Sequence, residues 1–301
     1  MSSDVVDRLL DGAVDLHVHP YPSPFPRRLD AAEAAQRAAD TGMRAIVVKS
    51  HHHDTAMDVA ALREHGIDRS GIQVFGGIAL NTQVGGFNPH AVNLCLAMGG
   101  RVVWMPTIAS PAHIAHHADP NLRFPALAVP LIPEQPLDVW ANGKPGELRR
   151  EVHEILKMIA EADAVLASGH LPPASIIAVF EAARDAGVRR MIVNHPNFVI
   201  EASKDEVRTM VELGAVIEHS LCMYDEESSF CNWRIDTLVD WIRWVGPEHS
   251  SLGSDLGQAN NPLPVDSFHK ICSRLIEAGM TEREVRSIVA DNPARLVGVD
   301  G

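Results

Sequence analysis

The sequence lacks the features that would place the protein in a membrane or on nucleic acid. None of its apolar runs approaches the roughly 20 residues that span a bilayer. It has no basic run, and its net charge of −13 argues against nucleic acid and anionic membranes as partners. Residues 1–11 carry charges and show no signal-peptide pattern. We therefore expect a cytoplasmic protein with neither nucleic acid nor a membrane as a partner.

Paired cysteines and a dinucleotide-binding motif are also missing. The four cysteines show no CxxC spacing or paired framework, which indicates reduced thiols rather than a disulfide scaffold. No GxGxxG motif follows the first apolar run, so the main support for a dinucleotide fold is absent. What the chain does have is 46% hydrophobic residues over 301 positions and a high count of 16 histidines. This length allows one large α/β domain or two small ones.

Apolar stretches that predict strands alternate along the chain with segments that predict helices. The strands are expected at 13–19, 44–50, 71–80, 101–107, 164–170, 190–195, 215–220 and 250–255. Helix starts are marked by capping boxes, in which a Ser, Thr or Asp precedes a Glu by three residues: Asp30 with Glu33, Ser203 with Glu206, and Thr281 with Glu284. The alternation implies parallel strands with right-handed crossovers.

Eight strand–helix pairs in about 300 residues predict an α/β fold of the (β/α)₈ TIM-barrel type. The second possibility is a doubly wound open sheet. We expect one domain over residues 1–301. A long insertion, 109–146, follows the fourth strand and is rich in Pro and His. Structureless loops of this length are usually functional lids or disordered, so we expect a lid or loop here.

The first predicted strand carries a His-x-His pair. Side chains alternate faces on a strand, so His17 and His19 point one way, together with Asp15. Two imidazoles on one face can close on a single divalent metal, although the pair alone is a weak signal. Pro20 then ends the strand because it cannot donate to a ladder.

Ionisable side chains also stand at the carboxyl ends of later predicted strands. In barrels of this type, that end of the strands holds the active site. A buried charge is costly unless it is paired or bound to a metal, so a metal site explains the set better than packing does. The set comprises His17, His19, Lys49, His170, His195, His219 and Asp255.

These motifs resemble the amidohydrolase superfamily of metal-dependent barrels. The matching pieces appear in the family's order and cover nearly the whole chain: Asp15-Leu-His17-Val-His19, Ser168-Gly169-His170, Asn194-His195-Pro196, Ser254-Asp255 and Asn292-Pro293-Ala294-Arg295-Leu296. The resemblance implies that one divalent metal, Zn²⁺ or Mn²⁺, is bound by four residues: His17, His19, His170 and Asp255. It also implies that His195 binds a second metal or polarises the substrate beside the first.

One departure from the family pattern concerns the number of metals. Two-metal members often use a bridging carboxylated lysine or a glutamate from a middle strand, and the fourth strand, 101–107, ends without either. One metal is therefore favoured; a second would draw on Lys49 or His195. Lys49 could instead form an ion pair with Asp255 or Glu218, or anchor a substrate oxyanion.

Other histidines are expected to contribute less. Consecutive residues cannot all face one metal, so at most one of His51, His52 and His53 is expected at the site. The histidines of the insertion are expected in solvent more than in a lid: His113, His116 and His117.

The chemistry implied is hydrolysis of an amide, cyclic imide, lactone or ester of a small molecule. A metal lowers the pKa of its bound water to about 7. Asp255 would accept the proton of that water and pass it to the leaving group, while His195 would donate to the developing oxyanion. The alternative is a metal-dependent decarboxylase with Lys49 as a carboxylate anchor. A phosphoesterase and a non-catalytic metal-binding barrel are less favoured. Barrels of this kind often pair, which leaves a homo-oligomer open.

Overall fold

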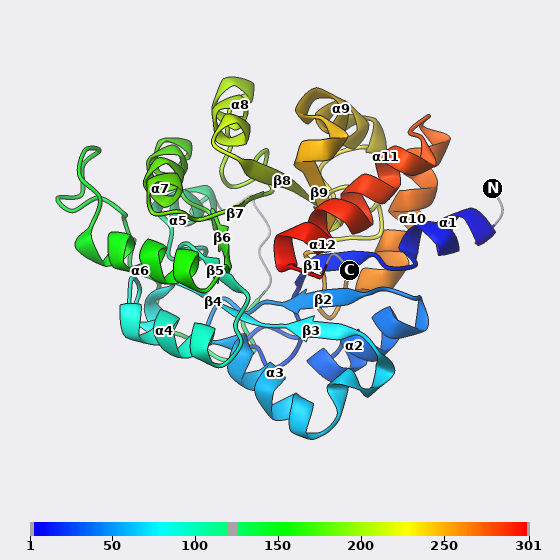
Figure 1. The fold of residues 1–301 in the computed structure, drawn as a ribbon, viewed down its shortest axis with the longest axis horizontal. Coiled ribbons are helices and arrows are strands. Elements are labelled where there is room, and N and C mark those ends of the chain that lie inside the picture. Colours follow the sequence, from blue (N-terminus) through cyan, green and yellow to red (C-terminus); the bar gives the residue numbers. More distant parts are fainter. Residues whose placement is uncertain (1–2, 120–125, 300–301) are drawn as a thin grey trace. The chain divides into compact units, whose positions relative to one another are not determined.

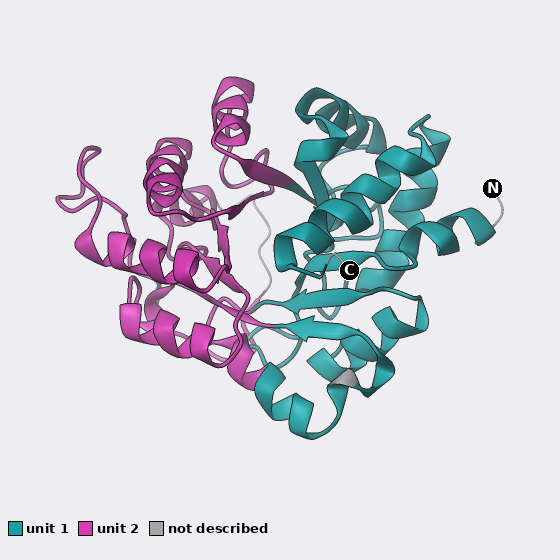
Figure 2. Cartoon of the chain, in the orientation of Figure 1, with its two compact units in different colours: residues 1–49, 59–75, 218–301 teal, residues 50–58, 76–217 magenta. Residues whose placement is uncertain are grey.

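The computed structural model describes residues 3–119 and 126–299. The chain divides into two compact units (Figure 2). Unit 1 comprises residues 1–49, 59–75 and 218–301, and unit 2 comprises residues 50–58 and 76–217. Unit 1 is therefore assembled from three separate stretches of chain.

The strands of unit 1 form a parallel sheet around β1 (Val14–Val18). On one side, β1 pairs with β2 (Ala45–Val48), which pairs with β3 (Gln73–Phe75). On its other side lies the chain that follows β9 (Ser250–Gly253), where the Asp255 amide donates to the His17 carbonyl at 2.7 Å. All residues of β1, β2 and β9 are buried. Their nearly continuous apolar runs are typical of strands covered on both faces.

Helices of unit 1 begin where the capping signals predicted them. Both predicted boxes here, at α2 (Ala31–Asp40) and α11 (Glu282–Arg286), have both of their hydrogen bonds. An N-terminal helix, α1 (Ser3–Leu10), was not predicted; it buries Val6, Leu9 and Leu10 and contacts α10. The remaining helices of this unit are α9 (Ile235–Val245), α10 (Pro264–Glu277) and α12 (Asn292–Val297). Helix α3 (Thr55–Glu64) begins in unit 2 and ends in unit 1.

Unit 2 contains a second parallel sheet in which sequential strands are neighbours. Its order is β4 (Gly77–Ala79), β5 (Val102–Trp104), β6 (Val165–Ala167) and β7 (Arg190–Asn194), followed by β8 (Ala215–Ser220). Helices α4 (Pro89–Ala97), α6 (Arg150–Glu161), α7 (Pro173–Asp185) and α8 (Lys204–Glu212) contact one another in sequence, as Figure 1 shows. The predicted box of Ser203 and Glu206 begins α8.

The third predicted strand, 71–80, is broken into β3 and β4 at Gly76. Thr55, the first residue of α3, explains the break within unit 2. Its Oγ1 donates to the Gly77 carbonyl at 3.0 Å and accepts from the Gly77 amide at 2.9 Å. A Cβ at position 76 would lie 2.5 Å from the backbone of Thr55. The side chain of Thr55 thus takes the place of a strand partner, and only glycine allows so close an approach.

The insertion 109–146 carries a short helix, α5 (Pro111–His116). Residues 120–125 lie outside the described residues. The later part of the insertion folds back on its start, because the Leu137 amide donates to the Ala109 carbonyl at 2.8 Å. Its role as a lid stays a prediction, as does the single domain over 1–301. Helix α6 begins at Arg150, shortly after the insertion.

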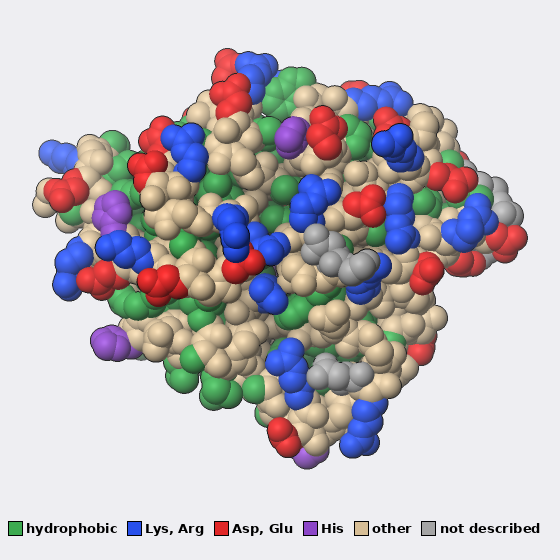
Figure 3. Space-filling view, viewed as in Figure 1, with side chains coloured by type: hydrophobic (Ala, Val, Ile, Leu, Met, Phe, Trp, Pro, Cys, Tyr) green, Lys and Arg blue, Asp and Glu red, His purple; other side chains and the backbone are tan. Residues whose placement is uncertain are grey.

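On the face seen in Figure 3, acidic and basic side chains are interspersed. Of the helices in the described residues, none combines the length and apolar character needed to cross a bilayer.

Candidate metal centre

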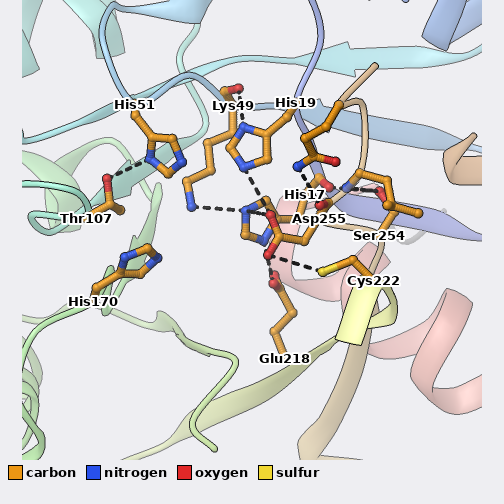
Figure 4. A network of polar contacts seen from close by, with 12 residues as sticks. His17, His19, Lys49, His51, Thr107, His170, Glu218, Cys222, Ser254 and Asp255 are labelled. Atoms are coloured by element: carbon orange, nitrogen blue, oxygen red, sulfur yellow. Dashed lines mark hydrogen bonds and ion pairs between the residues drawn. The ribbon is translucent and has the colours of Figure 1, made fainter. Parts of the chain in front are cut away.

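The His-x-His pair of β1 converges on Asp255, as Figure 4 shows. The Nε2 atoms of His17 and His19 lie 3.2 and 3.1 Å from the same oxygen, Asp255 Oδ1. The two rings have centroids 5.0 Å apart. Both histidines are almost fully buried, whereas the Asp255 side chain is 16% exposed and so can be reached by solvent. In the described residues, this trio is the one cluster of potential metal ligands.

The other ring nitrogens are held by acceptors. His17 Nδ1 lies 2.6 Å from Glu218 Oε1, and His19 Nδ1 lies 3.1 Å from the Lys49 carbonyl oxygen. Because each acceptor requires an N–H, we assign the proton of each neutral ring to Nδ1. A lone pair on each Nε2 then faces the cluster. Buried carboxylates and carbonyls orient metal-binding histidines in the same way.

With these tautomers, three acceptor atoms face one another: Nε2 of His17, Nε2 of His19 and Oδ1 of Asp255. Burial lowers the pKa of His19 to about 3, so its ring is neutral at physiological pH. Two imidazole lone pairs and a carboxylate oxygen repel one another, and a cation bound among them would relieve that repulsion. Two nitrogens and one oxygen suit a divalent ion such as Zn²⁺, which leaves further positions for ligands. The residues present therefore fit a metal.

Lys49 contributes a cationic group to the same cluster. It follows β2, and its Nζ lies 3.0 Å from His17 Nε2. Burial lowers the pKa of Lys49 to about 8, although the charges of Asp255 and Glu218 oppose the change. An amine with this pKa is partly neutral near pH 8 and can then act as a ligand.

Asp15 joins β1 to the end of β9 below the cluster. Its Oδ1 accepts from the backbone amides of His17 at 3.0 Å and Ser254 at 2.9 Å. Burial raises the pKa of Asp15 to about 6. Both bonds of Asp15 are therefore to backbone amides of unit 1. They fix the relative register of the two segments that carry His17 and Asp255.

The backbone is strained at two of the predicted site residues. Asp255 has φ of 53° and His195 has φ of 29°, both in the left-handed region that side chains with a Cβ rarely adopt. Such strain is concentrated at functional sites because the surrounding structure must hold it. Strand β7 ends at Asn194 and strand β9 ends at Gly253, before these two residues. Both strands are therefore shorter than predicted.

The two remaining predicted ligands, His170 and His195, belong to unit 2. Their rings lie 4.9 Å apart, so unit 2 brings them together. Their convergence with His17, His19 and Asp255 of unit 1 stays a prediction.

Unit 2 also brings His113 of α5 to His170, a contact that the sequence did not predict. His113 is 6% exposed, so its expected position in solvent is wrong. Its Nδ1 lies 2.9 Å from His170 Nδ1. A hydrogen bond between these atoms would leave His170 Nε2 as the nitrogen able to bind a metal. His51 is likewise buried, with Nδ1 2.8 Å from Thr107 Oγ1.

The residue predicted for the site on β8 is not the one that contacts the cluster in the structure. His219 was placed in the rim set, but its buried ring nitrogens have no hydrogen-bond partner in the described residues. Burial lowers the pKa of His219 to about 4. Its neighbour Glu218 is the residue that contacts His17. Alternation shows that the two face opposite ways, but the choice between them depends on which face of β8 is turned toward His17.

Comparisons with known proteins agree with this fold. The chain belongs to a family of unknown function, DUF6282, whose model matches residues 12–218. No curated protein matches it. Among solved structures, it is similar to an amidohydrolase from Pseudomonas aeruginosa, with a TM-score of 0.63 at 12% identity over 99% of this chain and 98% of that one.

Two further solved structures are similar over nearly their whole length. One is a probable 2-pyrone-4,6-dicarboxylic acid hydrolase from Acinetobacter baumannii, with a TM-score of 0.57 and 11% identity over 95% of this chain and 99% of that one. The other is an organophosphorus hydrolase from Deinococcus radiodurans, with a TM-score of 0.58 and 13% identity over 96% and 93%. The fold is therefore of the α/β TIM-barrel type, as the sequence predicted.

Proposed function

We propose that this chain is a metal-dependent hydrolase of a small molecule, cleaving an amide, cyclic imide, lactone or ester. The observation that carries the proposal is the convergence of His17 Nε2, His19 Nε2 and Asp255 Oδ1, three acceptor atoms of the kinds that bind a divalent metal. The hydrolases among the similar solved structures support the reaction class. We favour Zn²⁺ or Mn²⁺, with His170 as the fourth ligand.

In the proposed reaction, each residue of the site has a separate role. A divalent metal supplies the Lewis acidity that makes water a nucleophile near neutral pH. Asp255, whose carboxylate is partly exposed, accepts the proton of the attacking water and returns it to the leaving group. Glu218 and the Lys49 carbonyl hold the two rings in the orientation and tautomer that the site needs. His195 donates to the oxyanion that develops on the substrate, or binds a second metal.

Elemental analysis followed by a turnover assay tests the proposal. The purified protein should contain one equivalent of Zn²⁺ or Mn²⁺ per chain, and two equivalents would assign Lys49 and His195 to a second metal. Removal of the metal with a chelator should abolish hydrolysis across a panel of N-acyl amino acids, cyclic imides, lactones and esters. Readdition of Zn²⁺ or Mn²⁺ should restore it. Metal content without turnover on the panel would contradict the proposal.

Decarboxylation is the second candidate, and the cationic Lys49 beside His17 favours it, because an ammonium can anchor a substrate carboxylate. Release of CO₂ from a carboxylic acid substrate, without a new carboxylate or amine, would identify this reaction instead.

The contact of His113 with His170 gives a separate prediction. We expect His113→Phe to lower the affinity for Zn²⁺ by about 10- to 100-fold, because loss of a group that orients a metal-binding histidine has this effect. The measurement is a Zn²⁺ titration against a competing chelator. His116→Phe is the matched control: it changes the same helix, but His116 contacts the exposed Glu201 at 3.4 Å. Equal Zn²⁺ affinities in the two variants would remove His170 from the ligand set.

A further inference from the structure

The loop that follows β1 is joined to the loop that follows β9. The Arg28 amide donates to the Gly257 carbonyl at 2.8 Å, and the Ala259 amide donates to the Pro26 carbonyl at 3.1 Å. Gly257 has φ of 135° and lies so close to the His19 carbonyl that a Cβ there would clash with it. Arg27, between these bonds, is therefore fixed to the segment that carries Asp255.

Arg27 is a cation without an anionic partner. Its Nε is buried and has no hydrogen-bond partner, and no ion pair to this side chain is found in the described residues. The ring of Phe25 lies beneath it, with the guanidinium carbon 5.8 Å from the ring centroid. Burial lowers the pKa of Arg27 to about 10, and the charge of Asp255 opposes this change. A half-buried guanidinium with no carboxylate against it is costly in a protein of net charge −13.

The neighbouring Arg28 shows the contrast. Its side chain is exposed, and its Nη1 donates to the Asn261 carbonyl at 2.8 Å. Two adjacent arginines in one loop thus differ in environment: Arg28 has a hydrogen-bond acceptor from the protein, whereas within the described residues the contact of Arg27 is the ring of Phe25.

We propose that Arg27 binds a carboxylate of the substrate and so selects anionic substrates for the metal centre. The inference rests on the proposed function, since it names the substrate class of the same site. The planar guanidinium matches a carboxylate in a two-bond geometry. A phosphate would call for more donors, and Arg28 is already committed to Asn261. Asp255 is the carboxylate whose charge acts on the pKa of Arg27. A metal bound to Asp255 would offset that charge, so the guanidinium would be available to a substrate carboxylate.

A pair of esters that differ by one carboxylate tests the proposal by turnover. Monomethyl succinate carries a free carboxylate and dimethyl succinate does not, while the methyl ester to be cleaved is the same. Arg27→Gln should lower kcat/KM for monomethyl succinate by about 10- to 100-fold, the range expected for loss of hydrogen bonds between charged groups. It should leave dimethyl succinate nearly unchanged. Arg28→Gln, which removes the same charge from the same loop, should affect neither ester, and Arg27→Lys should restore part of the loss.

A binding measurement separates this proposal from the proposed function. Calorimetric titration with succinate, inorganic phosphate and the uncharged succinamide needs no turnover. Succinate should bind the wild-type protein and Arg28→Gln equally, and Arg27→Gln about 10- to 100-fold more weakly. This result would support the carboxylate site even if no ester were cleaved, in which case only the hydrolase assignment would fall. No saturable succinate binding, equal losses in both glutamine variants, or tighter binding of phosphate than of succinate would overturn the proposal.

Discussion

Asp255→Asn is expected to lower kcat/KM by about 10³-fold or more while leaving the fold intact. The carboxylate is both a proposed metal ligand and the proposed proton acceptor, and loss of general acid–base catalysis alone costs about 10²–10⁴-fold. Asparagine keeps the size of the side chain and tolerates the left-handed backbone that Asp255 adopts, so unfolding should not account for the loss. Steady-state kinetics with the best substrate of the panel, together with thermal unfolding, measures both effects.

The control for this substitution is Asp240→Asn on α9. Asp240 is exposed, and its substitution changes the net charge by the same amount. It should retain full activity. An Asp255→Asn variant with near wild-type turnover would contradict the role given to this residue, and His17→Ala then provides an independent test of the same centre.

Glu218→Gln is expected to weaken Zn²⁺ binding by about 10- to 100-fold, the usual cost of removing a group that orients a metal ligand. Glu218 Oε1 lies 2.6 Å from His17 Nδ1, and both side chains are 1% exposed. An ionised acceptor makes a stronger bond than an amide oxygen, so glutamine would hold the His17 ring less firmly and make Nε2 a poorer donor to metal. The measurement is a Zn²⁺ titration against a competing chelator, read beside the thermal stability of the metal-free protein.

Glu212→Gln serves as the matched control, because Glu212 is exposed at the end of α8. It should bind Zn²⁺ as the wild type does. If Glu218→Gln did the same, the carboxylate would be a structural partner of His17 with no influence on the metal.

Local patterns in the sequence predicted much of the fold. The alternation of apolar runs with capping signals identified the strands, and the three predicted capping boxes are present. The two-residue period of β1 placed His17 and His19 on one face, where they meet Asp255. The alternation and the two-residue period depend on neighbouring residues alone. The association of Asp255 with the two histidines came from the resemblance to the amidohydrolase superfamily.

Features that depend on contacts between distant segments were missed. The break at Gly76 arises from Thr55, and nothing in the run 71–80 indicates that this side chain will replace a strand partner. Glu218 and His219 alternate on β8, and the choice between them needs the position of His17. His113 lies in an irregular insertion without a periodic signal, so its burial against His170 could not be anticipated.

The assembly of unit 1 from stretches at both ends of the chain has a consequence for synthesis on the ribosome. His17 is made before its carboxylate partners, since Glu218 follows 201 residues later and Asp255 later still. At about 5–20 residues per second, the two histidines wait about 10–40 s for their first carboxylate partner. During that interval the centre lacks both carboxylates, so a nascent chain cannot complete it until Asp255 has been made.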